Sequence, residues 1–184
     1  MALAEMHPSL HFIVQLIEPA EEGGETVTGT EDLGGRITVQ RRMPMAAQVV
    51  ANADVYILRL TTPLKSVPLH RQILVELGAH FDVLRANTLA TLILALPLLP
   101  EPGAVGPDIE AKARLRDLYR FQLTGQCEME LGALLEMINS VGDSNGRLVV
   151  VSRIRSPQSD VVVVGVKYQA CLRPHDTRAS PMLV

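Results

Sequence analysis

Few residues of this chain have the types and spacing that catalysis or metal binding needs. The adjacent Arg41 and Arg42 could bind an anion or polarise a carbonyl group, although a connection with two arginines is more often soluble surface. Cys127 could act as a nucleophile, but no histidine lies near it in the sequence, and free cysteines are usually buried hydrophobic residues. His70 and His80 are ten residues apart, which does not fit the i, i+4 spacing of a metal site on a helix. These residues form no catalytic triad, metal cluster or phosphate-binding loop.

Apolar periodicity predicts an alternating order of strands and helices that would position these side chains. Short apolar runs rich in valine and isoleucine predict buried strands, and apolar residues at helical spacing predict helices. The predicted strands cover residues 10–15, 37–40, 54–60 and 88–98, and the predicted helices cover residues 67–86, 109–124 and 128–141. Two β-rich runs, residues 147–154 and 161–169, follow as a predicted hairpin.

The order of these elements predicts an α/β fold. A helix at 67–86 between two strands is typical of a crossover between parallel strands, so we expect a mostly parallel sheet with a C-terminal antiparallel hairpin. Residues 1–172 have the length of one domain, and the polar residues 173–184 are predicted to form a flexible tail. The glycine-rich connection 19–35, which holds four glutamates, is predicted to be a flexible loop.

The composition is that of a soluble domain and excludes several classes of partner. The 184 residues are 47% hydrophobic and carry a formal net charge of -3, which gives a nucleic-acid partner no electrostatic support. The two cysteines are too few for a disulfide framework, and no signal sequence opens the chain, so we expect a cytoplasmic protein. The apolar run 89–99 is about half the length of a membrane-spanning helix, and no membrane partner is expected.

Three segments, taken in order, resemble the C-terminal part of the fungal cation-independent O-methyltransferases. They are HPSLHFIVQ (7–15), ADVYILRL (53–60) and LATLILALPLLPEPG (89–103), and the resemblance extends from about residue 7 to about residue 169. Those enzymes use S-adenosylmethionine and act mostly on secondary metabolites. The resemblance implies an incomplete Rossmann-like methyltransferase sheet, in which the family's central first strand and the glycine-rich loop after it are missing. It also implies that Tyr119 and Arg120 lie on a helix that lines the substrate pocket.

The residues that the family uses for methyl transfer mostly differ here. The acid near the cofactor ribose is lost or displaced to Glu18, and Arg41 and Arg42 follow the third strand where the family has an aspartate. Pro63 falls where the family has the histidine that acts as general base, and proline cannot accept a proton. Cys127 takes the position of the glutamate that supports this histidine. We therefore expect that S-adenosylmethionine binding has been lost, and we expect no cofactor and no metal.

Two functions of different classes fit these losses. The first is a repurposed enzyme, a cyclase or isomerase of the pericyclase type, acting on a hydrophobic secondary metabolite. Such chemistry needs a shaped apolar pocket and a few polar groups, for which the candidates are Arg41, Arg42, Tyr119, Arg120 and Cys127. The second is a non-catalytic pseudo-methyltransferase whose open sheet edge pairs with a second copy or with a homologous partner chain.

Two further alternatives remain at this point. One is the subunit of a split O-methyltransferase, which Pro63 disfavours, and the other is an inactive fragment. The missing central strand leaves three structural outcomes, because unpaired strand edges are costly when they are buried. The second strand closes against the fourth, another chain donates a strand, or the chain is unstable alone.

Overall fold

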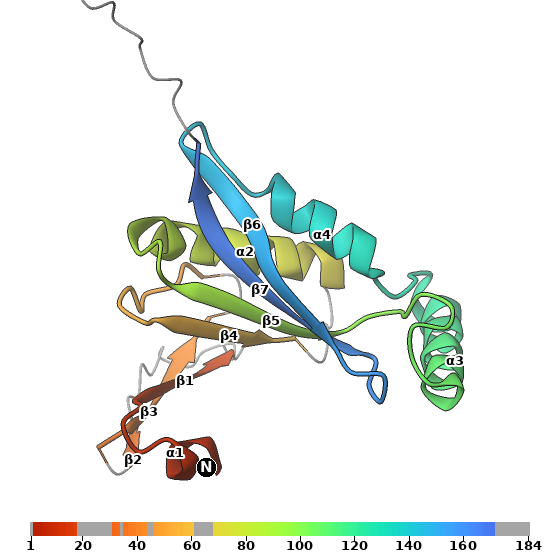
Figure 1. Cartoon of the computed structure of the whole chain (residues 1–184), viewed down its shortest axis with the longest axis horizontal. Coiled ribbons are helices and arrows are strands. Elements are labelled where there is room, and N and C mark those ends of the chain that lie inside the picture. The colour runs from red at the N-terminus through yellow and green to blue at the C-terminus, as the bar shows by residue number, and fades with distance from the viewer. Residues whose placement is uncertain (1, 18–30, 34, 44–45, 61–67, 172–184) are drawn as a thin grey trace, which may run out of the picture. The chain divides into compact units, whose positions relative to one another are not determined.

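The computed structural model describes residues 2–17, 31–33, 35–43, 46–60 and 68–171 of the chain. The chain divides into two compact units, Met1–Ala47 and Gln48–Val184 (Figure 1). Four features of the sequence analysis lie outside the described residues: the predicted tail 173–184, most of the predicted loop 19–35, Glu18, and Pro63 with its neighbours.

The first unit is a small sheet with one short helix. It contains α1 (Ala2–Met6), β1 (Phe12–Ile17), β2 (Glu31–Leu33) and β3 (Ile37–Arg42), in the sheet order β1-β3-β2. β1 and β3 are parallel, and β2 runs antiparallel to β3. The guanidinium of Arg36 donates hydrogen bonds of 3.1 Å to the carbonyls of Ala4 and Pro8 and so ties α1 to the sheet. β2 corrects the prediction of a loop over 19–35, because three of those residues pair with β3.

The second unit holds the predicted crossover and hairpin. Its elements are β4 (Val55–Arg59), α2 (Leu69–Ala86), β5 (Thr91–Pro97), α3 (Pro107–Thr124), α4 (Leu131–Ser140), β6 (Gly146–Arg155) and β7 (Val161–Ala170). The sheet order is β4-β5-β7-β6. β4 and β5 are parallel across α2, and β7 is antiparallel to both β5 and β6. The α/β fold with a C-terminal antiparallel hairpin is therefore confirmed.

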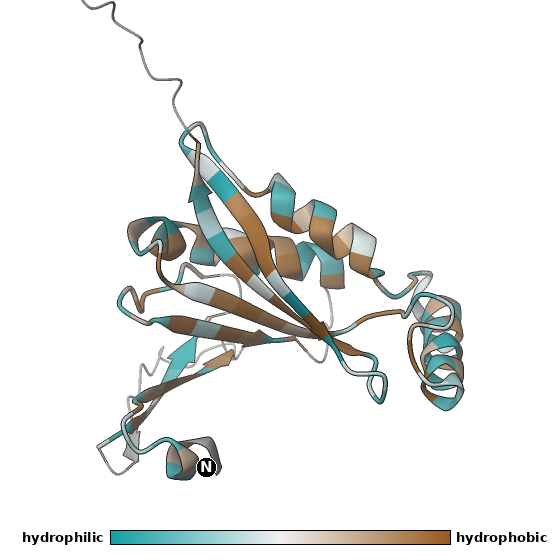
Figure 2. Cartoon of the chain, in the orientation of Figure 1, coloured by the Kyte–Doolittle hydropathy of each residue, from teal (hydrophilic) through white to brown (hydrophobic). Residues whose placement is uncertain are grey.

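The core of this unit lies between one face of the sheet and two helices. Every second residue of β5 is buried, as expected for a strand with one face against helices. α2 packs on β5 and β7, and α4 packs on β6 and on α2. Ile73 and Leu77 of α2 and Leu134 and Ile138 of α4 are fully buried in this layer. Figure 2 shows the same pattern as brown residues along β5 and β7 and along one side of α2 and α4.

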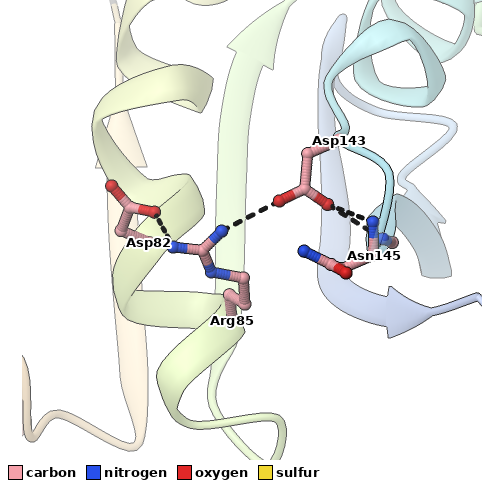
Figure 3. A network of polar contacts seen from close by, with 5 residues as sticks. Asp82, Arg85, Asp143 and Asn145 are labelled. Atoms are coloured by element: carbon pink, nitrogen blue, oxygen red, sulfur yellow. Dashed lines mark hydrogen bonds and ion pairs between the residues drawn. The ribbon is translucent and has the colours of Figure 1, made fainter.

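A polar network fixes the end of α2 to the turn before β6 (Figure 3). Arg85 donates hydrogen bonds of 2.7 Å to Asp82 and 2.8 Å to Asp143. Asp143 also accepts the backbone N–H groups of Asn145 and Gly146, at 2.8 and 2.9 Å. These contacts, first among them the hydrogen bond from Asn145, hold the pKa of the Asp143 carboxyl below its ordinary value.

The described strands form two sheets where the resemblance implies one. β1 pairs with β3, and β4 pairs with β5, but β1 and β4 are not partners in either sheet. The division falls where the resemblance places the missing central strand.

Candidate interaction site

β4 has a strand partner on one edge only among the described strands. The N–H of Thr91 donates a 3.0 Å hydrogen bond to the carbonyl of Asp54, directly before β4. In a parallel pair, alternate residues of a strand direct both their N–H and their C=O to the same neighbour. Asp54, Tyr56 and Leu58 therefore bond toward β5. The residues between them direct their backbone groups toward the open edge.

These edge residues are Val55, Ile57 and Arg59. Their side chains also point away from the helix layer, because Tyr56 and Leu58 occupy the buried face. Val55 is 50% exposed and Ile57 is 67% exposed, which is high for large aliphatic residues of a sheet. The site thus offers free backbone donors and acceptors beside exposed aliphatic side chains.

A cluster of hydrogen-bonded side chains, Tyr56, His80 and Gln48, lies on the helix side of β4. The Tyr56 hydroxyl donates a 2.8 Å hydrogen bond to the Val50 carbonyl and packs edge-on against the His80 ring. His80 Nδ1 lies 2.7 Å from the Glu76 carbonyl, which can only accept, so Nε2 accepts from the Gln48 amide at 3.1 Å. Burial raises the pKa of the Tyr56 hydroxyl. This group is structural, because it joins the segment before β4 to α2.

α3 is attached to the rest of its unit through polar contacts. Its one buried residue is Ala113. Arg116 binds both carboxylate oxygens of Glu128, with the Nη2 to Oε2 distance at 2.7 Å, and it also binds Asp160. Asp117 accepts the Glu128 N–H at 2.6 Å. The hydrogen bond to Glu128 is the largest cause of a raised pKa at Arg116, against the opposing effect of burial.

The opposite side of α3 is apolar and exposed. Leu115, Leu118 and Tyr119 are 51%, 52% and 57% exposed, and they follow the i, i+3, i+4 spacing of one helix face. Leu123 lies at the margin of this face and is 83% exposed, whereas Phe121 is 53% exposed and lies four residues after Asp117, nearer to that side of the helix. α3 is therefore amphipathic, but its polar side faces its own unit and its apolar side faces solvent.

The five residues predicted to supply pocket polarity lie in different places. Arg41 and Arg42 belong to the first unit, where Arg41 is exposed and Arg42 is buried and donates a 2.8 Å hydrogen bond to the Ala46 carbonyl. In the second unit, Tyr119 lies on the outward face of α3 and Arg120 is half-buried. Cys127 is exposed beyond the end of α3, and not buried as free cysteines usually are.

None of the five is among the residues that line a hollow beside α4 and β6. That hollow has a volume of about 420 Å³ and is open to solvent beside α4 and β6. Leu135, Asn139 and residues 149–153 line it. Since an enzyme of the predicted kind needs a closed apolar pocket, this hollow gives the catalytic hypothesis little support.

Sequence reasoning missed the residues that position α3. Glu128 and Asp160 lie 12 and 44 residues from Arg116, so no local pattern links them. The only hint in the sequence is the acidic residue directly after Cys127. It lies in the segment that the resemblance aligns with the family's glutamate, which supports the catalytic histidine. Glu128 holds α3 in place there. Among the described residues, no group of three or more His, Cys, Asp and Glu side chains could hold a metal ion.

Several curated fungal proteins are similar to this chain in sequence, although no protein-family model matches it. A transcriptional coactivator of Pseudocercospora fijiensis is 51% identical over 173 residues, which are 92% of this chain and 48% of that protein. The trypacidin cluster transcriptional coactivator of Aspergillus fumigatus is 44% identical over 172 residues, 92% of this chain and 38% of that protein. The chain therefore spans about half the length, or less, of these relatives.

Solved structures agree with the described fold. LepI in complex with SAM matches with a TM-score of 0.64 and 18% identity, over 91% of this chain and 39% of LepI. A protein described as a pericyclic reaction enzyme matches with a TM-score of 0.62 and 19% identity over 91% of this chain and 39% of its own. The mitomycin 7-O-methyltransferase MmcR matches with a TM-score of 0.50 and 16% identity over 73% of this chain and 34% of MmcR. The fold is methyltransferase-like. At these identities the likeness concerns the fold alone.

None of the described helices is long and apolar enough to cross a membrane.

Proposed function

We propose that this chain is a non-methylating, protein-binding domain that serves the transcription of a fungal secondary-metabolite gene cluster. The observation that carries the proposal is the edge of β4 away from β5, where the backbone groups of Val55, Ile57 and Arg59 have no partner among the described strands and lie beside exposed aliphatic side chains. Such an edge binds an extended partner segment through main-chain hydrogen bonds. The coactivator names of relatives that match 92% of the chain support a role in protein association.

The strand that completes β4 comes, in this proposal, from the part of a homologous coactivator that lies outside the matched region. The match covers 48% of the Pseudocercospora fijiensis protein, so a comparable length of that chain is available to supply a strand. The partner strand is apolar on the side that meets Val55 and Ile57. A second copy of the chain is the other possible source, and the experiment separates the two.

The substitution Ile57→Pro tests the edge directly. It removes the central outward N–H of β4 without removing a hydrogen bond to β5, and edge positions are where sheets accept proline. Ile57→Val keeps the N–H and is the matched control. We expect the unmatched part of the Pseudocercospora fijiensis protein, co-expressed with the tagged chain, to co-purify with wild type and Ile57→Val and to be lost with Ile57→Pro.

Light scattering of the purified chain identifies the source of the strand. A wild-type dimer that becomes a monomer with Ile57→Pro would place a second copy at the edge. Co-purification that Ile57→Pro leaves unchanged would overturn strand addition. Circular dichroism of the variant shows whether the sheet has been kept.

A pericyclase-like enzyme is the second candidate, because a protein described as a pericyclic reaction enzyme shares the fold. The two functions predict different consequences in a producing fungus. Loss of a coactivator lowers the transcripts of the whole gene cluster, and Ile57→Pro should do the same. Loss of an enzyme changes the ratio of product isomers while transcripts stay constant, and the substitutions Arg120→Ala and Cys127→Ser would then cause that change.

A further inference from the structure

We propose that the outward face of α3 is a second docking surface, and that it binds an amphipathic helix whose apolar stripe is flanked by acidic residues. This surface is distinct from the β4 edge, so the inference does not rest on strand addition.

The first step is the orientation of α3, which its polar contacts fix. Arg116 binds Glu128 and Asp160, and Glu128 is only 7% exposed, so this side of the helix is held against its unit. Arg114 adds a 2.9 Å hydrogen bond to the Pro100 carbonyl. Because successive residues are 100° apart around a helix, a side held through Ala113 and Asp117 leaves the side centred on Leu115 facing outward.

The second step is the chemistry of the outward side. Leu115, Leu118 and Tyr119 form an apolar group of more than half exposure on one helix face, with Leu123 at its margin and the exposed Gln122 in the next turn. Isolated exposed apolar residues are common, but a contiguous group on one helix face marks an interaction surface. The i, i+3, i+4 spacing is the one that a second helix matches with its own stripe.

The third step is the charge beside the stripe. Lys112 lies on one flank and is exposed, and Arg114 lies on the other and is half-buried. Arg114 is 3.6 Å from Glu110, whereas Lys112 has no ion pair among the described residues. Arg114 is also bonded to the Pro100 carbonyl, so Lys112 is the cation that remains beside the apolar residues, with the exposed Asp108 one turn before it. Charge complementarity with Lys112 therefore favours acidic residues beside the apolar stripe of the partner helix.

The fourth step is size. Four exposed apolar side chains on a helix of 18 residues amount to a few hundred Å² of apolar surface, below the roughly 800 Å² per partner of a standard stable interface. The helix is about 27 Å long, which corresponds to five turns of a partner helix. The area thus fits a single docked helix better than a folded dimer that uses this face alone.

The test uses the full chain and a fluorescein-labelled synthetic peptide with leucines at i, i+3, i+4 and i+7 and glutamates on the flanks. A matched peptide carries lysine in place of glutamate. The double substitution Leu115→Gln and Leu118→Gln removes the stripe while keeping good helix formers. Leu74→Gln on α2 is the control, because Leu74 is 43% exposed on a helix of the same length.

In fluorescence anisotropy we expect the acidic peptide to bind wild type and Leu74→Gln equally, and to bind the double variant at least about tenfold more weakly. Lys112→Glu should weaken the acidic peptide and strengthen the basic one. Equal binding of both peptides to wild type, or binding that the double variant does not change, would overturn the proposal. Self-association that disappears in the double variant, without peptide binding, would also overturn it and assign the face to a second copy. The substitution Ile57→Pro does not change α3, so we expect the Ile57→Pro variant to bind the acidic peptide as strongly as wild type does. This expectation holds even if the strand-addition proposal is wrong, so the two proposals can be tested separately.

Discussion

α2 and α3 are both 18 residues long, yet they use their apolar residues in opposite ways. α2 buries eight residues, while α3 buries Ala113 alone. α2 is held by apolar packing on β5 and β7, and α3 is held by Arg116 and Asp117. The difference shows that apolar periodicity identifies a helix face, whereas the contacts of the polar residues decide whether that face points to the core or to solvent.

The largest expected effect is the difference in stability loss between a buried leucine of α2 and an exposed leucine of α3. Leu77 is fully buried in α2, so Leu77→Ala should lower the free energy of unfolding by about 2–5 kcal/mol. Leu118 is 52% exposed, and Leu118→Ala should change it by less than about 0.5 kcal/mol. Urea denaturation followed by circular dichroism measures both. Similar losses for the two variants would mean that α3 packs its apolar side inward.

The next effect compares two arginines that each bind two acids. Arg116→Met leaves the largely buried carboxylate of Glu128 without its cation, and we expect a loss of about 1–3 kcal/mol. Arg85→Met breaks the pairs with Asp82 and Asp143, which involve more exposed groups and contribute about 0–1 kcal/mol. Limited trypsin digestion should also cut α3 faster in Arg116→Met than in wild type. An equal rate would show that other contacts hold the helix.

The smallest expected effect is a pH dependence at the end of α2. The pKa of Asp143 is lowered from its ordinary value of 3.8, so its carboxylate stabilises the fold above that pH. The contribution is lost as the pH falls through the lowered value in the folded state. Asp143→Asn keeps an acceptor for the turn but cannot titrate, so its urea midpoint should fall less than that of wild type between pH 5 and about pH 3.

Most elements of the fold were predictable from the sequence because their apolar periods are regular. The strand over 37–40 is part of β3, and the helix over 67–86 differs from α2 by two residues at its start. The helix over 128–141 begins later, at Leu131, because Glu130 forms a bridge with Leu99. α1 and β2 were missed because five and three residues are too few for a period to appear.

The candidate site was less predictable because its features depend on distant pairs. The ion pair between Arg116 and Asp160 joins residues 44 apart, and only the folded chain shows that it turns the apolar side of α3 outward. The division of the described strands into two sheets was not predicted, because the resemblance implied one incomplete sheet. The roles of Tyr119, Arg120 and Cys127 stay predictions, because exposure alone assigns them no chemistry.

The order of strands in the second unit also has a kinetic consequence. The hairpin β6–β7 closes over residues 156–160, and such hairpins form within about 1–10 μs. β4 pairs with β5 across the connection that contains α2, whereas β5 joins the hairpin only across the longer connection that contains α3 and α4, so the pairing of β5 with β7 is the slowest step expected for this sheet. Because β7 has a strand on both sides and β4 has one among the described strands, we expect β4 amides to exchange with deuterium faster than those of β7. The parallel pair β4–β5 and the hairpin would then exist as separate units while the sheet is still assembling, which would allow a partner segment to be captured at that stage.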